Sequence, residues 1–305
     1  MEKSDFVPLV VIGSPGKLRS TSLELLVTKL ETVIFVDPVQ ITRQNRLGTV
    51  VNEQLSEVMC GKRLSDSELG CAIAHKNARI QADIAIASSD IFKWVLIVED
   101  DVDLGIDSFN IINRELTTVD FKSPAIVNYD YRNTRGSLTF RNINERGTFR
   151  AKRYLAAGAV CYAINREGLQ VLHRFGDVPI DYVADWPMPF AHLKVYIPNQ
   201  TQVFDIQGAT SMGQRHQPKH WLIMLFSQLF YLRKIARLYE ISIWRTAGYL
   251  FLATPARANS QRIQIVQSKF DTCRTAAEGL FRRFSDFQRF IMHGKNDTSV
   301  DEKNG

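Results

Sequence analysis

The chain has 305 residues, of which 45% are hydrophobic and 23% charged, with a formal net charge of +6. These values are ordinary for a globular protein that can bury a sizeable core. No N-terminal signal-peptide pattern and no run of about 18 apolar residues occurs, so we expect neither secretion nor a membrane span. The four scattered cysteines argue against a zinc site and for reduced thiols in a cytosolic setting.

The hydrophobic pattern predicts strands that alternate with helices. The strands are expected at 7–12, 32–36, 94–98, 125–129, 155–164 and 195–197, with a polar hairpin at 135–150. The helices are expected at 20–30, 65–87, 107–116, 166–174 and 181–190, and the stretch 45–60 is irregular or helical. This order predicts an α/β fold with a mainly parallel sheet covered on both faces.

The predicted helix at 65–87 carries chemistry on one face. Ser65 and Glu68 form a capping-box pattern that opens the helix. Glu68, Cys71 and His75 then lie on one face by helical spacing. A Glu and a His on an otherwise small face suggest a ligand contact, although a lone helical His is more often a core residue.

The predicted strand at 94–98 runs directly into acidic residues. Glu99, Asp100, Asp101 and Asp103 follow five apolar positions. Carboxylates at the end of a buried strand need partners, and a hard divalent cation is the usual one. Ligands also bind at the carboxyl ends of strands in open α/β sheets. The pattern predicts a metal and substrate site, and the alternative is a solvated acidic turn.

Together these two segments resemble glycosyltransferase family 25, the lipooligosaccharide galactosyltransferases of Gram-negative bacteria. The matching pattern is L-S-x-x-E-x-G-C-x-x-x-H at 64–75, followed by an apolar strand that ends in Glu-Asp-Asp at 99–101. Further likeness lies at 158–164, 179–185 and 210–215, so that it spans about residues 7–216. Three features depart from the family. Ala74 replaces a usual Ser, the aromatic residue commonly found a few positions later is missing, and the turn after the first strand is altered, with Arg19 alone keeping its role.

The resemblance implies a GT-A-like fold, a Rossmann-type nucleotide-binding sheet, and inverting transfer from a nucleotide sugar. It implies Mn²⁺ or Mg²⁺ bound by Asp101, with Asp103 as a possible second ligand. Residues expected to contact the nucleotide sugar are Arg19, Glu68, His75, Glu99 and Asp100. An inverting reaction needs a general base, for which we favour Asp185 over Asp181. Asp181 also suits a helix N-cap.

The positive charge is concentrated in the tail. Residues 218–305 hold 14 Lys and Arg and 7 Asp and Glu, a net of +7, so the first 217 residues have a net of −1. Basic residues interleaved with Trp, Tyr, Phe and Leu predict helices that lie on an anionic membrane. The alternative is that they pack on the catalytic domain. We expect a catalytic domain at 1–217, a membrane-associating region at 218–295 and a disordered tip at 296–305, with no nucleic-acid partner.

The resemblance therefore implies a metal-dependent hexosyltransferase. UDP-galactose is the most common donor in the family, and a change of few side chains could select glucose or another hexose. The expected acceptor is lipid-linked or an oligosaccharide of lipopolysaccharide, at the cytoplasmic face of the inner membrane. One alternative is a degenerate family member that only binds the membrane surface. Another is a divalent-metal phosphoryl or nucleotidyl transferase, although that class should show a P-loop or paired His/Asp ligands, and the sequence shows neither.

Overall fold

The computed structural model of the chain describes most of its N-terminal four-fifths. The described residues are 7–42, 52–60, 63–88, 91–119, 121–129, 141–142, 149–152, 159–176, 188–198, 204–205 and 221–247. The chain divides into two compact units, 1–254 and 255–305, and the second lies outside the described residues. The predicted domain boundary after residue 217 lies outside the described residues and stays a prediction. The predicted tip at 296–305 also lies outside the described part.

Over the described residues, eight strands form one sheet in the order β2-β1-β3-β8-β5-β9-β7-β6. They are β1 Leu9–Ile12, β2 Val33–Val36, β3 Trp94–Glu99, β5 Ala125–Asn128, β6 Arg141–Asn142, β7 Phe149–Lys152, β8 Cys161–Asn165 and β9 Lys194–Pro198. The pairings give six of these strands one direction, whereas β8 and β7 run opposite to it. The predicted mainly parallel α/β sheet is confirmed in this coarse sense.

The reversal of β8 between β3 and β5 is a feature that the sequence analysis did not predict. Between β5 and β8 the described elements are the antiparallel pair β6 and β7, and no helix is described there. A parallel neighbour needs a long crossover, usually helical, whereas a reversed strand does not. A separate pair of two-residue strands, β4 Val102–Asp103 and β10 Phe204–Asp205, was also not predicted.

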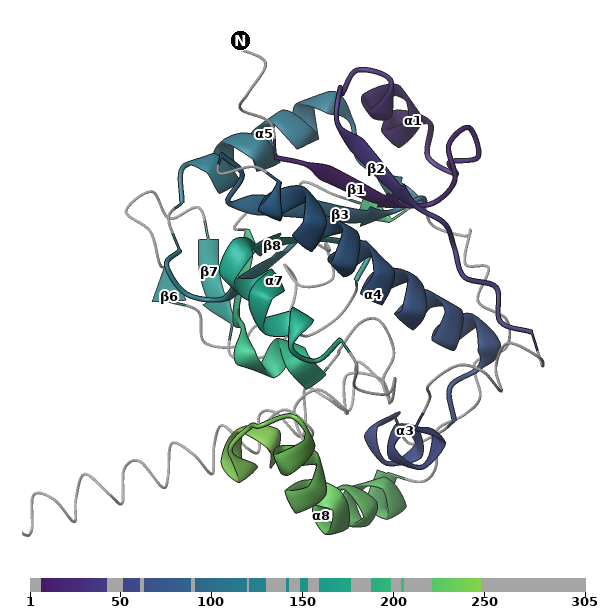
Figure 1. The fold of residues 1–305 in the computed structure, drawn as a ribbon, viewed down its shortest axis with the longest axis vertical. Helices are drawn as coiled ribbons and strands as arrows, with labels where there is room; N and C mark the ends of the chain where they lie inside the picture. Colours follow the sequence, from purple (N-terminus) through teal and green to yellow (C-terminus); the bar gives the residue numbers. More distant parts are fainter. Residues whose placement is uncertain are drawn as a thin grey trace, which may run out of the picture. The chain divides into compact units, whose positions relative to one another are not determined.

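Helices cover both faces of the sheet, as predicted (Figure 1). The described helices are α1 Thr21–Val27, α3 Glu53–Cys60, α4 Asp66–Ala87, α5 Ile106–Thr117, α7 Arg166–His173, the 3-10 helix η1 Met188–His192, and α8 Trp221–Leu238. Helices α4 and α7 contact the strands of the sheet, whereas α3 and α8 pack against each other. Alternate strand residues such as Leu96 and Val98 join the buried cluster formed with α1 and α5. Tyr162 of β8 instead reaches α4, so the two faces bury different helices.

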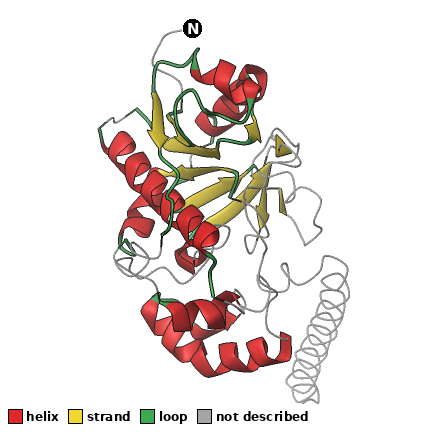
Figure 2. Ribbon diagram, turned by 90° about the vertical axis from the view of Figure 1, so that its right-hand side faces the viewer, coloured by secondary structure: helices red, strands yellow, loops and turns green. Residues whose placement is uncertain are grey.

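The long helix α4 runs beside the strands of the sheet, and it is the long diagonal helix of Figure 2. Its capping box is present: the Ser65 hydroxyl accepts from Glu68 N, and the Glu68 carboxylate accepts from Ser65 N at 3.1 Å. A Cβ on Gly70 would stand 2.2 Å from the carbonyl oxygen of Val39. Glycine is therefore required for the segment around Val39 to lie directly on the helix.

Elsewhere the predicted elements agree with the structure within a few residues, with two exceptions. The strand predicted at 155–164 is described only as β8 at Cys161–Asn165, with 155–158 outside the described residues. The helix predicted at 181–190 has only its last residues in the described part, where Met188–His192 is a 3-10 turn. Residues 181–187 lie outside the described residues.

Helix α8 belongs to the first unit and packs on other elements of that unit through one face. Three hydrogen bonds hold it, joining Gln54 Nε2 to Tyr231 Oη at 2.6 Å, Gln228 Nε2 to the Val58 carbonyl at 3.3 Å, and a ring nitrogen of His192 to the Tyr239 carbonyl at 2.7 Å. The start of the predicted membrane-associating region is thus helical and is docked on α3. Within the described residues, no helix is both long and apolar enough to cross a membrane.

Candidate active site

The acidic residues lie at the edge where two parallel strands end together. In the register of β1 and β3, Ile12 pairs with Glu99, so the residues that follow both strands meet. A Cβ on Gly13 would be 2.8 Å from the Cβ of Asp100. The loop after β1 therefore presses against the acidic segment, and this contact requires a glycine. The structure confirms that the carboxylates stand at a strand end, where ligands bind in open α/β sheets.

Arg19 is the cationic partner of this edge. Its Nε donates to Asp100 Oδ1 at 2.9 Å, its Nη2 also contacts that oxygen, and Nη2 lies 3.1 Å from Asp101 Oδ2. The backbone N–H groups of Arg19 and Ser20 donate to the Asp100 carbonyl. The hydrogen bond to Asp100 raises the pKa of Arg19, and the nearby charges of Asp101 and Glu99 add to it. The predicted placement of Arg19 in the site agrees with this geometry.

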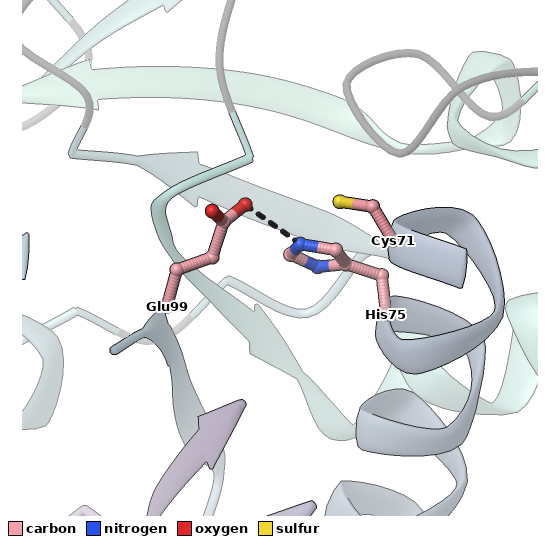
Figure 3. Close-up of side chains that lie close together, drawn as sticks. All are labelled: Cys71, His75 and Glu99. Atoms are coloured by element: carbon pink, nitrogen blue, oxygen red, sulfur yellow. Dashed lines mark hydrogen bonds and ion pairs between the residues drawn. The ribbon is translucent and has the colours of Figure 1, made fainter. Parts of the chain in front are cut away.

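Hydrogen bonds lead from Tyr162 of strand β8 through His75 of helix α4 to Glu99, and Figure 3 shows the bond between His75 and Glu99. His75 is fully buried, with Nε2 2.9 Å from Glu99 Oε1 and Nδ1 3.0 Å from Tyr162 Oη. A carboxylate only accepts hydrogen bonds, so Nε2 donates to Glu99. A neutral His75 then accepts from the Tyr162 hydroxyl through Nδ1. Every bond in the chain therefore points its donor toward the carboxylate.

Tyr162 remains a hydrogen-bond donor across the working range of pH. Burial raises the pKa of Tyr162 to about 12, although a hydrogen bond and charge from Arg79 lower it in part. Arg79 itself lies over the ring of Phe190, with 5.5 Å from its Cζ to the ring centroid. Tyr162, Arg79 and Phe190 hold His75 in place, and His75 in turn orients Glu99, because rings and guanidinium groups packed in the core have little freedom to move.

Cys71 completes a trio with His75 and Glu99. Among the described residues, these three are the one group of His, Cys, Asp and Glu whose ligand atoms all lie within 4.8 Å of one another. Both nitrogens of His75 are already engaged, however, and a thiolate is a soft ligand unsuited to Mn²⁺ or Mg²⁺. We therefore assign the His75 contact to orienting Glu99 rather than to holding a metal.

The charge of the edge suits a hard divalent cation. Glu99, Asp100 and Asp101 bring three carboxylates to this edge, where Arg19 pairs with Asp100 and Asp101 and His75 lies beside Glu99. Mg²⁺ in such sites commonly takes one or two carboxylates and completes its shell with water and substrate phosphates. The buried Asp101 fits this role. Asp103 is exposed and lines a groove between α1 and α5.

The remaining predicted site residues have different outcomes. Glu68 lies one turn before the trio, where its Oε2 accepts from the backbone and hydroxyl of Ser65 and so serves the helix cap. Asp181 and Asp185 lie outside the described residues. Sequence reasoning missed Tyr162 and Arg79. The spacing of four between His75 and Arg79 places both on one face of α4, and this was the only available signal.

Comparison with known proteins identifies a family. The model of glycosyltransferase family 25, described as LPS biosynthesis protein, matches residues 24–193, which is 170 of the 305 residues. The match includes both motif segments and 181–185, and it excludes Arg19 and α8. No curated protein sequence matches the chain. Among solved structures, the crystal structure of A197 from STIV aligns over 70% of this chain and all of its own, at 13% identity and a TM-score of 0.35, which is too low to establish a shared fold.

Proposed function

The chain belongs to glycosyltransferase family 25, and on this premise we propose that it transfers a hexose from a nucleotide sugar, with UDP-galactose the expected donor. The proposed acceptor is a saccharide of lipopolysaccharide, lipooligosaccharide or a related surface glycan. We place the reaction at the cytoplasmic face of the inner membrane, because a lipid-linked acceptor is presented at a membrane surface. The observation that carries the proposal is the Glu99-Asp100-Asp101 segment, held at the ends of two parallel strands by Arg19 and His75.

The charge of this edge gives the proposal its physical reason. A nucleotide sugar carries a diphosphate, which the clustered carboxylates of Glu99, Asp100 and Asp101 repel. Mn²⁺ or Mg²⁺ held by Asp101, with Asp103 as the alternative or second ligand, would supply a Lewis acid for the charge that develops on the departing diphosphate. Arg19 lies in reach of the same region and can exchange part of its bonding from Asp100 and Asp101 to phosphate oxygens.

Glu99 and Asp100 are proposed to bind hydroxyl groups of the ribose or the donor sugar. Both carboxylates are oriented before substrate arrives, Glu99 by His75 and Asp100 by Arg19. A carboxylate fixed in this way accepts a hydroxyl hydrogen bond without losing further side-chain freedom, which favours binding in a single geometry.

The attack on the anomeric carbon needs a base that removes the proton of the acceptor hydroxyl. We propose Asp185 for this step, with Asp181 as the second candidate, on the basis of the family resemblance. Both residues lie within the segment that the family model matches. In an inverting reaction the acceptor oxygen bonds to the anomeric carbon as the bond to the diphosphate breaks, and the proton passes to the base.

Donor binding tests the proposal directly. Titration calorimetry would use UDP-galactose, UDP-glucose and UDP-N-acetylglucosamine, each with Mn²⁺ and with EDTA. We expect one donor to bind only with the metal, and Asp101→Asn to weaken that binding. The matched control is Asp83→Asn, since Asp83 is also an aspartate with a side-chain partner, the Nδ1 of His173 at 3.3 Å, but between α4 and α7.

Two outcomes would contradict the proposal. Binding that EDTA leaves unchanged would remove the metal from the donor site. Binding of none of the three donors, by a protein that melts normally, would favour the degenerate family member that acts at a membrane surface. Turnover of a nucleoside triphosphate would instead favour a nucleotidyl or phosphoryl transferase.

A further inference from the structure

Helix α8 has an inner face that the rest of the unit covers and an outer face that it leaves exposed. Gln228, Ile235, Ala236 and Tyr239 are buried. They recur at helical spacing with Tyr231, which bonds Gln54 of α3. This inner face anchors the helix, so the orientation of the outer face is fixed by packing within the same unit.

The outer face combines large apolar side chains with basic ones. Phe230 is 83% exposed, and Leu229 beside it is also exposed. Arg233, Lys234 and Arg237 follow on the same side of the helix and are exposed. After a turn at Glu240, which has a positive φ of 52°, Ile243 and Trp244 are exposed, Trp244 by 87%. Arg245 comes next and is also exposed.

The charge of this region is one-sided. Residues 221–247 contain four basic residues and one acidic residue. Basic side chains suit anionic lipid headgroups, and Trp and Phe rings are favoured at the depth of those headgroups. Interfaces between proteins also favour Trp, Phe and Arg, but their buried core is depleted of charged residues, whereas here charged side chains alternate with the apolar ones. The mixture of exposed aromatic and cationic groups therefore favours a lipid surface over a protein partner.

We propose that this outer surface, made of the exposed residues of 229–245, binds the surface of a bilayer that contains anionic phospholipid. Phe230 and Trp244 enter the headgroup region, and Arg233, Lys234, Arg237 and Arg245 contact lipid phosphates. This inference names the residues that hold the enzyme at the surface where a lipid-linked acceptor is found. Its biological role rests on the proposed function. Vesicle binding itself does not depend on catalysis.

Co-sedimentation of the full-length protein with vesicles tests the inference. The vesicles are phosphatidylcholine alone, or phosphatidylcholine mixed with phosphatidylglycerol. We expect binding to the mixed vesicles that weakens as salt is raised, because salt screens surface charge. The triple variant Arg233→Gln, Lys234→Gln, Arg237→Gln should bind about 100-fold more weakly, at roughly five-fold for each charge removed. Phe230→Ser and Trp244→Ser should each weaken binding several-fold.

Matched controls separate this surface from general effects of charge and hydrophobicity. Ile84→Ser removes an apolar side chain that is 57% exposed on α4, and Lys29→Gln removes an exposed charge near α1. Both controls should bind vesicles as the wild type does. Every variant should keep its transfer activity on a soluble acceptor, so a failure of the proposed function and a failure of this inference are distinguishable.

Three results would overturn the inference. One is equal binding to the neutral and the anionic vesicles. Another is wild-type binding by the triple variant, which would assign membrane attachment to residues beyond Ala247. The third is an absence of vesicle binding together with a dimer in sedimentation that Phe230→Ser or Trp244→Ser dissociates, which would assign the surface to a second copy of the chain.

Discussion

Removing the hydroxyl of Tyr162 is the sharpest test of the hydrogen-bond chain behind Glu99. In Tyr162→Phe the ring that packs in the core stays, and only the oxygen 3.0 Å from His75 Nδ1 is lost. His75 is fully buried, so this nitrogen loses its partner without gaining water. An unsatisfied buried group costs about 1–3 kcal/mol of folding free energy. At roughly 2–4 °C per kcal/mol for a unit of this size, the melting temperature should fall measurably.

The same change should weaken catalysis, because His75 loses the Nδ1 partner that fixes its tautomer, and with it the constant donation from Nε2 that orients Glu99. A misplaced binding group lowers kcat/KM on the order of ten-fold or more. The assays are thermal unfolding followed by circular dichroism, and donor titration with the same preparation. A lower affinity for the nucleotide sugar at a temperature where the variant is fully folded separates orientation of the site from loss of stability.

Tyr129→Phe is the matched control. Tyr129 is also fully buried, but within the described part of the chain its hydroxyl oxygen has no hydrogen-bond partner. Burial raises the pKa of Tyr129 well above its ordinary value, so the group stays neutral. Removing an unsatisfied hydroxyl should be neutral or stabilising. If the two variants lower the melting temperature equally, or if Tyr162→Phe binds donor as the wild type does, the reasoning about the chain is refuted.

Three further changes probe other parts of the account. Arg19→Gln should weaken donor binding roughly 10- to 100-fold through loss of charge-assisted hydrogen bonds, with Arg19→Lys intermediate; an unchanged Kd would exclude Arg19 from the donor site. Gly70→Ala places a Cβ 2.2 Å from the Val39 carbonyl oxygen and should cost about 1–3 kcal/mol in denaturant unfolding, whereas an unchanged midpoint would show that the loop moves freely. Burial raises the pKa of Glu115 from 4.5 to about 7, so ionisation destabilises the folded state as the pH rises through this range. At pH 8, Glu115→Gln should therefore melt roughly 2–4 °C higher than the wild type, after allowing for solvent screening. At pH 4 the two proteins should melt at the same temperature, and a difference of the same size at both pH values would contradict this.

Local patterns in the sequence predicted much of the fold and part of the site. The capping box at Ser65 and Glu68 depends on residues three apart, and the structure has it as predicted. The apolar run before Glu99 forms a buried strand, and this too depends only on residues that are neighbours in the sequence. His75 and Glu99 were both selected as site residues, and the structure joins them by a hydrogen bond, although no local pattern shows that they meet.

What the sequence could not show depends on contacts between distant segments. Tyr162 reaches His75 only because β8 runs antiparallel to β3, with Ile97 opposite Tyr162. Strand direction between distant segments leaves no mark on hydrophobic periodicity, so the reversal of β8 was not predicted. The two-residue strands β4 and β10 are too short to show any period. Gly13 has no sequence signature either, because its role is a close approach to Asp100.

The central claim is that the edge formed by Glu99, Asp100 and Asp101 supports transfer of a hexose from a nucleotide sugar. The measurement that tests it most directly is incubation with UDP-galactose, Mn²⁺ and a panel of saccharide acceptors, followed by mass spectrometry of the acceptors and quantification of released UDP. We predict that one acceptor gains a single hexose, with an equal amount of UDP released, and that EDTA or Asp101→Asn stops both. Release of UDP without any modified acceptor, or transfer that persists in EDTA and in Asp101→Asn, would contradict the account.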